Sequence, residues 1–138
     1  RADPAALRAR AWLPEAAGRA YPHRLSGGMA RRALLATALA TAPWALIADE
    51  PTAGLDPETA DAMLDLLAGL AAEGLAVLVV SHDLPRLAAR AGAITVLREG
   101  RMVETSPAAA FAGDGAGLAD PWTRALWRAQ PAVAAAAC

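Results

Sequence analysis

The chain contains no lysine, a single cysteine and few aromatic residues. All 13 basic side chains among its 138 residues are arginines, and 14 acidic side chains bring the net charge to −1. A balance this close to zero excludes a strong general attraction to nucleic acid or anionic lipid. The lone Cys138 excludes an internal disulfide and a multi-cysteine metal site within this chain. An intracellular protein is the simpler interpretation.

Two longer patterns are missing as well. No apolar run approaches the ~20 residues of a membrane-spanning helix, and no signal peptide follows Arg1, which stands where a methionine would begin the chain. The pattern G-x-x-x-x-G-K-S/T, a glycine-rich loop whose amides and lysine hold phosphates, does not occur either. The missing first methionine and the missing glycine-rich loop together predict the carboxyl-terminal part of a longer protein, or a fragment of one.

A short apolar run followed by two acids dominates what is present. Residues 44–48 are apolar, Asp49 and Glu50 follow at once, and Pro51 stops the run. This pattern is typical of a buried strand in a parallel sheet, and such sheets bind ligands beyond the carboxyl ends of their strands. Asp49 is therefore a candidate to hold Mg²⁺ beside a phosphate, and Glu50 to polarise a water. The alternative is a strand end whose acids merely face solvent.

A second apolar strand is predicted over residues 75–80, and it leads directly into His82. The strand–helix–strand order predicts a right-handed parallel crossover with both carboxyl ends at one edge of the sheet. Asp49, Glu50 and His82 are then expected to converge, which makes His82 a candidate partner for a terminal phosphate. Taken alone, a single histidine is more often a structural or solvated residue.

Two helices frame these strands. One is expected from Ser26, a good N-cap, to about Thr41, with Gly27 and Gly28 in its first turn. The amides and dipole of such a helix start favour an anion, although a serine and two glycines equally well form a plain cap. The other helix follows Asp56 and runs over residues 57–72. Its predicted buried stripe comprises Met63, Leu66, Leu67 and Leu70.

The remaining segments are shorter. Residues 93–97 and 101–105 are predicted to form a hairpin around Glu99-Gly100. The other expected features are a short helix and loop over 1–18, small helices over 84–90 and 107–111, a flexible link over 112–119, a last helix over 121–129 and a frayed end over 132–138.

These motifs, in this order and spacing, resemble those of the ATPase subunits of ABC transporters. Residues 25–29 resemble the signature motif, 45–50 the Walker B strand with its catalytic glutamate, 53–56 the D-loop and 81–83 the switch histidine, while residues 98–104 resemble the hairpin that follows. Four motifs together are far more specific than any one of them. Met29 in place of the usual glutamine, Tyr21-Pro22-His23 and residues 121–126 resemble importers of oligopeptides, dipeptides and nickel.

The resemblance implies an α/β fold, a P-loop NTPase-like parallel sheet flanked by helices. That sheet would be incomplete here because the Walker A part is absent, and a small hairpin and helix would follow it. Residues 1–111 would be the carboxyl-terminal portion of the ATPase domain. Residues 112–138 would form a linker and a helical tail.

The resemblance also implies ATP and Mg²⁺ as cofactors and a head-to-tail pair of ATPase subunits. Each nucleotide would lie between Walker A of one subunit and the signature of the other. The implied roles are Mg²⁺ binding through water for Asp49, water activation for Glu50, γ-phosphate binding for His82, ATP binding in trans for Ser26, Gly27, Gly28 and Met29, and a link between the two sites for Asp56.

The implied partners are a second ABC ATPase subunit and an integral membrane permease, without nucleic acid, at the cytoplasmic face of the cell membrane. Hydrolysis would drive the import of a small solute such as a peptide or nickel. Two alternatives remain open at this point. One is a non-catalytic module that supplies only the signature motif to a partner, and the other is a soluble ABC ATPase without a transport role, against which residues 121–126 argue.

Overall fold

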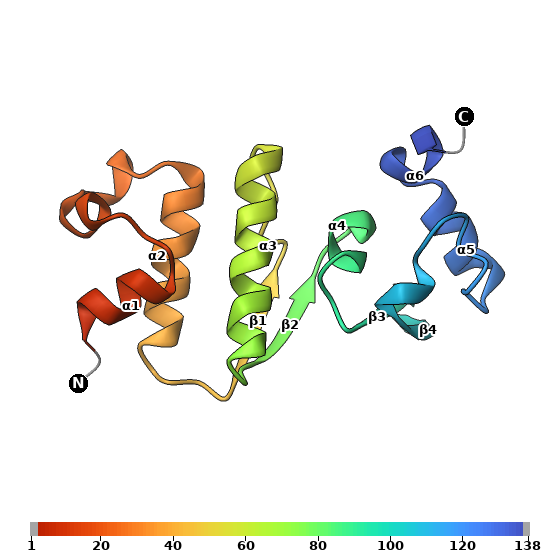
Figure 1. Cartoon of the computed structure of the whole chain (residues 1–138), viewed down its shortest axis with the longest axis horizontal. Coiled ribbons are helices and arrows are strands. Elements are labelled where there is room, and N and C mark those ends of the chain that lie inside the picture. The colour runs from red at the N-terminus through yellow and green to blue at the C-terminus, as the bar shows by residue number, and fades with distance from the viewer. Residues whose placement is uncertain (1–2, 137–138) are drawn as a thin grey trace. The chain divides into compact units, whose positions relative to one another are not determined.

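The computed structural model describes residues 3–136, and the chain divides into two compact units, Arg1–Val80 and Ser81–Cys138 (Figure 1). The first unit contains α1 (Pro4–Arg10), η1 (Glu15–Arg19), η2 (Pro22–Arg24), α2 (Gly27–Leu39), β1 (Ala45–Asp49), α3 (Pro57–Ala72) and β2 (Ala76–Val80). The second contains α4 (Leu84–Ala88), β3 (Ala93–Arg98), β4 (Arg101–Pro107), η3 (Ala108–Ala110), α5 (Pro121–Arg128) and α6 (Pro131–Ala136).

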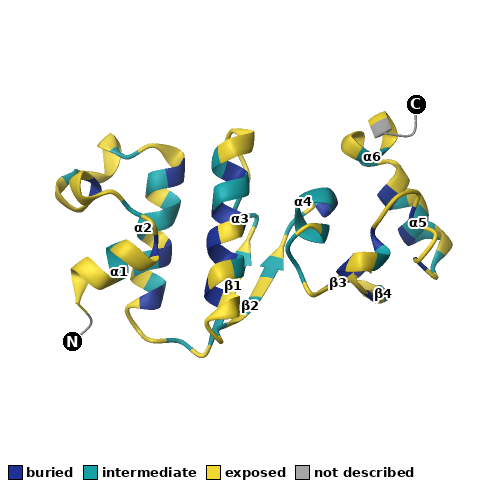
Figure 2. Ribbon diagram, viewed as in Figure 1, coloured by how far each residue is buried: buried dark blue, intermediate teal, exposed yellow. Residues whose placement is uncertain are grey.

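Helix α3 supplies most of the buried apolar surface of the first unit. Its predicted stripe is confirmed, because Met63, Leu66, Leu67 and Leu70 are all 2–3% exposed, and Figure 2 shows buried positions along the helix. Each such leucine stabilises the fold by roughly 2 kcal/mol relative to an exposed one. Helix α2 packs against α3, and its apolar face buries Leu35 and Leu39.

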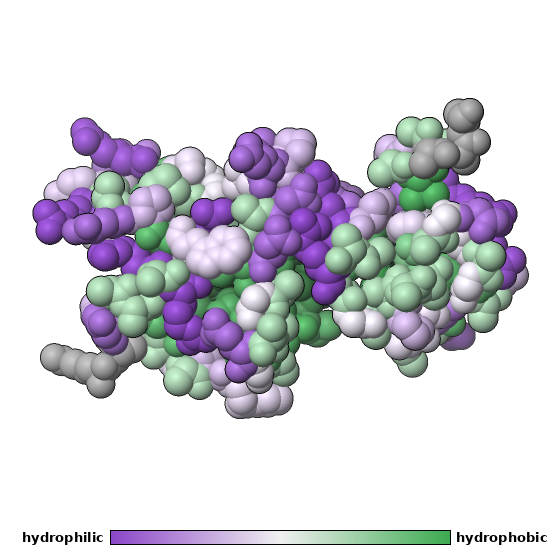
Figure 3. Space-filling model, viewed as in Figure 1, coloured by the Kyte–Doolittle hydropathy of each residue, from purple (hydrophilic) through white to green (hydrophobic). Residues whose placement is uncertain are grey.

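Strands β1 and β2 pair in parallel, from Ala45 opposite Ala76 to Asp49 opposite Val80, as the crossover predicts. The expectation of fully buried strands is wrong for this structure. Ile47 is 71%, Leu78 57% and Val80 48% exposed. Helix α3 packs on β2, and the alternate side chains project to the opposite face. Apolar residues on both faces fit a sheet that is covered on both sides. Figure 3 views this unit from the side of α3, and on that face hydrophobic residues lie among hydrophilic ones.

The second unit is built on the predicted hairpin. Strands β3 and β4 are antiparallel, with a register shift between Val96 and Leu97. One face of the hairpin packs into a core whose rings, Phe111 and Trp127, meet edge to face at a centroid distance of 5.7 Å. The buried members of this core are Leu84, Ile94, Val96, Ala108, Phe111, Leu118 and Trp127.

Residues 112–119, expected to form a flexible link, are packed against this core. Leu118 is 1% exposed, and the indole Nε1 of Trp127 donates to the carbonyl of Gly113 at 3.1 Å. Gly115 has a φ of +75°, and a β-carbon there would lie 2.8 Å from Trp127. Small residues let this segment turn closely around the indole. A composition rich in glycine and alanine therefore does not imply flexibility here. The boundary between residues 111 and 112 stays a prediction.

The end of the chain also differs from expectation. Residues 131–136 form α6 rather than a frayed segment, while the rest of that predicted segment, including Cys138, lies outside the described residues.

Glu104 ties β4 to the start of α5. Its Oε1 accepts hydrogen bonds from the Ser106 hydroxyl at 2.6 Å and the Ala119 amide at 2.9 Å, and its Oε2 accepts one from the Asp120 amide at 3.1 Å. These donors favour the charged carboxylate. The Ser106 hydroxyl first, and then the Ala119 amide, lower the pKa of Glu104 below its ordinary value of 4.5.

Replacing Glu104 by Gln is expected to destabilise the second unit at neutral pH by about 1–2 kcal/mol, because an amide cannot accept all three bonds. The folded pKa lies below the unfolded one, so this stabilisation is full above about 4.5 and is lost as the pH falls through the folded pKa. Chemical unfolding followed by tryptophan fluorescence measures both effects. Glu99→Gln, at an exposed turn position, is the control; equal stabilities of the two variants at pH 7 would contradict the role.

Candidate functional site

The segment that follows β1, residues 49–56, is called the acid turn here. Glu50 adopts a φ of +43°, in the left-handed region that a non-glycine residue seldom occupies. Its amide donates to the Val80 carbonyl at 2.8 Å, and its own carbonyl accepts from the Ala53 amide at 3.2 Å. Asp49 is exposed at the last position of β1. The two predicted acids therefore lie at the carboxyl end of the paired strands, as expected.

An arginine that the sequence analysis did not assign to the site holds this turn. The guanidinium of Arg31, on α2, donates from Nη1 to the Glu50 carbonyl at 2.7 Å and from Nη2 to the Ala53 carbonyl. No positive signal in the sequence pointed to Arg31. The only indication was that it lies off the apolar face of its helix, whose residues Leu35 and Leu39 are buried. The bonds connect the helix of the signature-like motif directly to the turn that carries Glu50.

The start of α2 has the expected form of an anion site. Ser26 is its N-cap, and its Oγ accepts from the Met29 amide at 3.2 Å. The Ser26 carbonyl takes the first intrahelical bond, from Ala30 at 2.8 Å. The amides of Gly27 and Gly28 precede that bond, so the helix itself offers them no acceptor. Two adjacent amides at a helix start can bind a phosphate oxygen.

The two glycines have different surroundings. A β-carbon at Gly27 would find its nearest neighbour, Leu55 Cδ2, at an ordinary 3.6 Å. A β-carbon at Gly28 would lie only 2.5 Å from Thr59 Cγ2. Gly27 is thus open to a ligand, whereas Gly28 is required by the close packing of α2 on α3.

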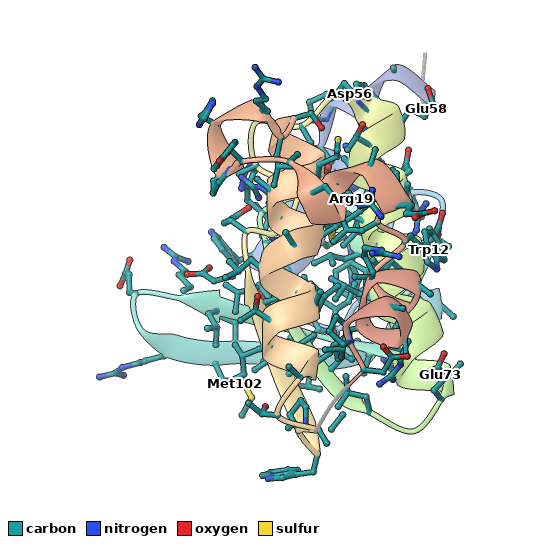
Figure 4. The ribbon with its side chains drawn as sticks, turned by 90° about the vertical axis from the view of Figure 1, so that its left-hand side faces the viewer. Trp12, Arg19, Asp56, Glu58, Glu73 and Met102 are labelled. Carbon is teal, nitrogen blue, oxygen red and sulfur yellow. The ribbon has the colours of Figure 1, made fainter. Side chains whose placement is uncertain are left out.

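Asp56 caps α3, its Oδ1 accepting from the Thr59 amide at 3.0 Å. A side-chain hydrogen bond from Thr59 and then this backbone bond lower the pKa of Asp56 below its ordinary value. Figure 4 shows Asp56 and Glu58 at one end of α3 and Glu73 at the other. Asp56 is thus the last residue of the acid turn, and its carboxylate is held at the first turn of α3.

His82 belongs to the second unit. It is exposed, and its carbonyl accepts from the Leu84 amide at 3.1 Å. The next residue, Asp83, caps α4 by accepting from the Arg86 amide at 3.3 Å. The convergence of His82 with Asp49 and Glu50 stays a prediction.

The donor set fits a magnesium ion that is shared with a phosphate. Within residues 3–136 there is no group of three or more His, Cys, Asp or Glu side chains that could hold a metal ion by themselves. Mg²⁺ does not require such a cage, because one or two carboxylates with waters and phosphate oxygens are its usual ligands. The exposed Asp49 can supply one of these oxygens.

Comparison with known proteins decides the family. A family profile described as "ABC transporter" matches residues 4–53. The chain is 41% identical over 125 residues to the dipeptide transport ATP-binding protein DppD of Escherichia coli K12. The aligned region covers 88% of this chain and 37% of that protein. The chain belongs to the ATP-binding family of ABC transporters.

Solved structures of ABC proteins share the fold. CbiO1 of Clostridium perfringens, part of the ABC transporter complex CbiONQ, superposes with a TM-score of 0.71 at 29% identity, over 76% of this chain and 42% of that one. The ATP-binding cassette MJ0796, in a dimeric post-hydrolysis state with ADP and phosphate, gives 0.65 at 31% identity, over 75% and 45%. The predicted α/β, P-loop NTPase-like fold class is confirmed.

The chain thus spans 37–45% of the length of these proteins. None of the helices in residues 3–136 is long and apolar enough to span a membrane.

Replacing Gly28 by Ala is expected to cost roughly 1–2 kcal/mol of stability, because the β-branched Thr59 cannot move its methyl group out of the way cheaply. Thr59→Ser removes that methyl group and keeps a hydroxyl for Asp56, so the double variant should recover the loss. Gly27→Ala should leave stability nearly unchanged. Chemical unfolding of the four proteins tests this, and a Gly28→Ala variant as stable as the parent would refute the packing role.

Proposed function

We propose that this chain is part of an ATPase that powers ABC-type import of a small solute. The observation that carries the proposal is the joint placement of the acid turn and the start of α2, which Arg31 connects. Family membership supplies the reaction class. The relative's name and residues 121–126 favour a peptide as solute, with nickel as the next choice.

In this proposal Glu50 orients or deprotonates the attacking water. Its position just beyond β1, with the backbone held on both sides, suits a group that must be aimed accurately. Asp49 holds Mg²⁺ through water, and that ion offsets the charge of the phosphates when bound. His82 binds the γ-phosphate and senses its loss. Phosphoryl transfer of this kind depends on positioning and electrostatics rather than on covalent chemistry.

Ser26, Gly27, Gly28 and Met29 bind the nucleotide of a partner subunit, and Asp56 links the two sites. The amides of Gly27 and Gly28, to which the helix itself offers no acceptor, support this assignment. The 138 residues contain no G-x-x-x-x-G-K-S/T, so the phosphate loop for any nucleotide at α2 must come from other residues. A second ATPase subunit and a membrane permease are the proposed partners, with the ATPase peripheral to the cytoplasmic face.

The exposed helix start at Ser26 also suits a second candidate, a non-catalytic module that presents its α2 start to a complete partner. The two functions differ in their need for Glu50. It is essential for turnover in an import ATPase and dispensable in a non-catalytic module.

In the complete gene product that contains these residues, Glu50→Gln is expected to keep ATP binding and to lose most phosphate release, on the order of 100-fold or more, because general-base catalysis is worth that much. Phosphate release and ATP-dependent dimerisation measure the two properties. Near-normal turnover would reject the role of Glu50 and favour the non-catalytic module.

The 138 residues alone are expected to bind ATP with a Kd on the order of millimolar or poorer, because phosphate-loop amides and lysine supply much of the affinity. Titration calorimetry with ATP and Mg²⁺ tests this. Micromolar binding would show that the residues described here hold nucleotide by themselves, contrary to the proposal of a site completed in trans.

A further inference from the structure

Arg31 makes two directed contacts with the backbone of the acid turn. One nitrogen of its guanidinium meets the Glu50 carbonyl at 2.7 Å, and the other meets the Ala53 carbonyl. A guanidinium is planar and presents its donors as a rigid fork, so the paired bonds fix both the distance and the orientation of the two carbonyls. The Glu50 contact is partly buried, which limits competition from water.

The residue that this fork holds is in a costly conformation. Glu50 has a φ of +43°, and left-handed backbone at a non-glycine residue persists only where its surroundings enforce it. Three hydrogen bonds enforce it. The Glu50 amide donates to the Val80 carbonyl, and the Glu50 carbonyl accepts from the Ala53 amide and from Arg31. Of these, only Arg31 comes from outside the strands and the turn.

Arg31 also lies on the helix whose first turn begins at Ser26. Arg31 therefore connects the helix start that is proposed to bind the partner subunit's nucleotide to the turn that carries Glu50. Close packing at Gly28 and Thr59 fixes this helix against α3.

We propose that Arg31 is a positioning residue for hydrolysis, which holds the Glu50 main chain in the left-handed conformation that aims its carboxylate. The inference rests on the proposed function, because it requires Glu50 to act on the water. Arg31 itself touches no reacting atom. Its loss should lower the rate of the chemical step and leave nucleotide affinity nearly intact.

The test compares four variants in the complete gene product. Arg31→Met keeps the length of the side chain without donors, and Arg31→Lys keeps the charge without the fork. We expect Arg31→Met to lower kcat by about 10- to 100-fold, the effect of a small misplacement of a catalytic group, with KM for ATP within about twofold. Arg31→Lys should recover part of the loss.

The remaining two variants are controls. Arg10→Gln removes an arginine whose partner is Glu73, at 2.8 Å, and Figure 4 shows Glu73 at the end of α3 opposite Asp56; its kcat should equal that of the parent. Glu50→Gln reports on the proposed function itself. Hydrogen exchange of the peptide covering residues 50–56 gives a readout that does not depend on activity. It should accelerate in Arg31→Met, to a smaller extent in Arg31→Lys, and not in the two controls.

The outcomes separate the two proposals. An Arg31→Met protein with parental kcat, while Glu50→Gln is inactive, overturns the positioning role and leaves the proposed function standing. Unchanged exchange in residues 50–56 also overturns it. A Glu50→Gln protein with parental turnover overturns the proposed function, and the role of Arg31 with it. If Arg31→Met fails to fold, Arg31→Lys decides by the same kcat and exchange measurements.

Discussion

The close approach of α2 to α3 is the contact on which the site depends. Gly28 meets Thr59 where a side chain would not fit, and this brings the start of α2 beside the helix that follows the acid turn. At that separation Arg31 can reach the Glu50 and Ala53 carbonyls. A wider spacing between the helices would leave the amides at the start of α2 intact and would break the contact that connects this helix to the turn carrying Glu50.

Asp56 and Arg31, two of the charged groups near the turn, have structural partners that also limit what they can do. The Asp56 carboxylate is engaged by Thr59 as the cap of α3, so any link that it makes across a subunit boundary has to use its remaining lone pairs. Arg31 uses two of its hydrogen-bond donors on carbonyl oxygens, so it binds the main chain rather than a phosphate. Asp49 is exposed at the end of β1, which suits a ligand shared with solvent.

Local sequence signals predicted most of the elements. The parallel pairing of β1 with β2, the hairpin of β3 and β4, and the buried stripe of α3 all follow from periodicity, caps and turn residues, which act over a few positions. Contacts between distant residues were not predictable in this way. Nothing in the sequence pairs Thr59 with Gly28 or Arg31 with Glu50, and the placement of Leu118 under Trp127 contradicts the flexibility that a glycine-rich composition indicates. The exposure of Ile47 and Leu78 was not predicted, because an apolar composition shows that a strand can be buried but not which element covers it.

If Glu50 has the proposed role, its left-handed backbone sets stability against activity. Glycine would occupy that conformation without the steric penalty of a β-carbon, by something like 1 kcal/mol. A screen that rewards heat resistance alone would therefore enrich a chain in which the acid is gone and the fold is improved. Under the proposed role, the glutamate is kept for its chemistry in spite of that steric cost.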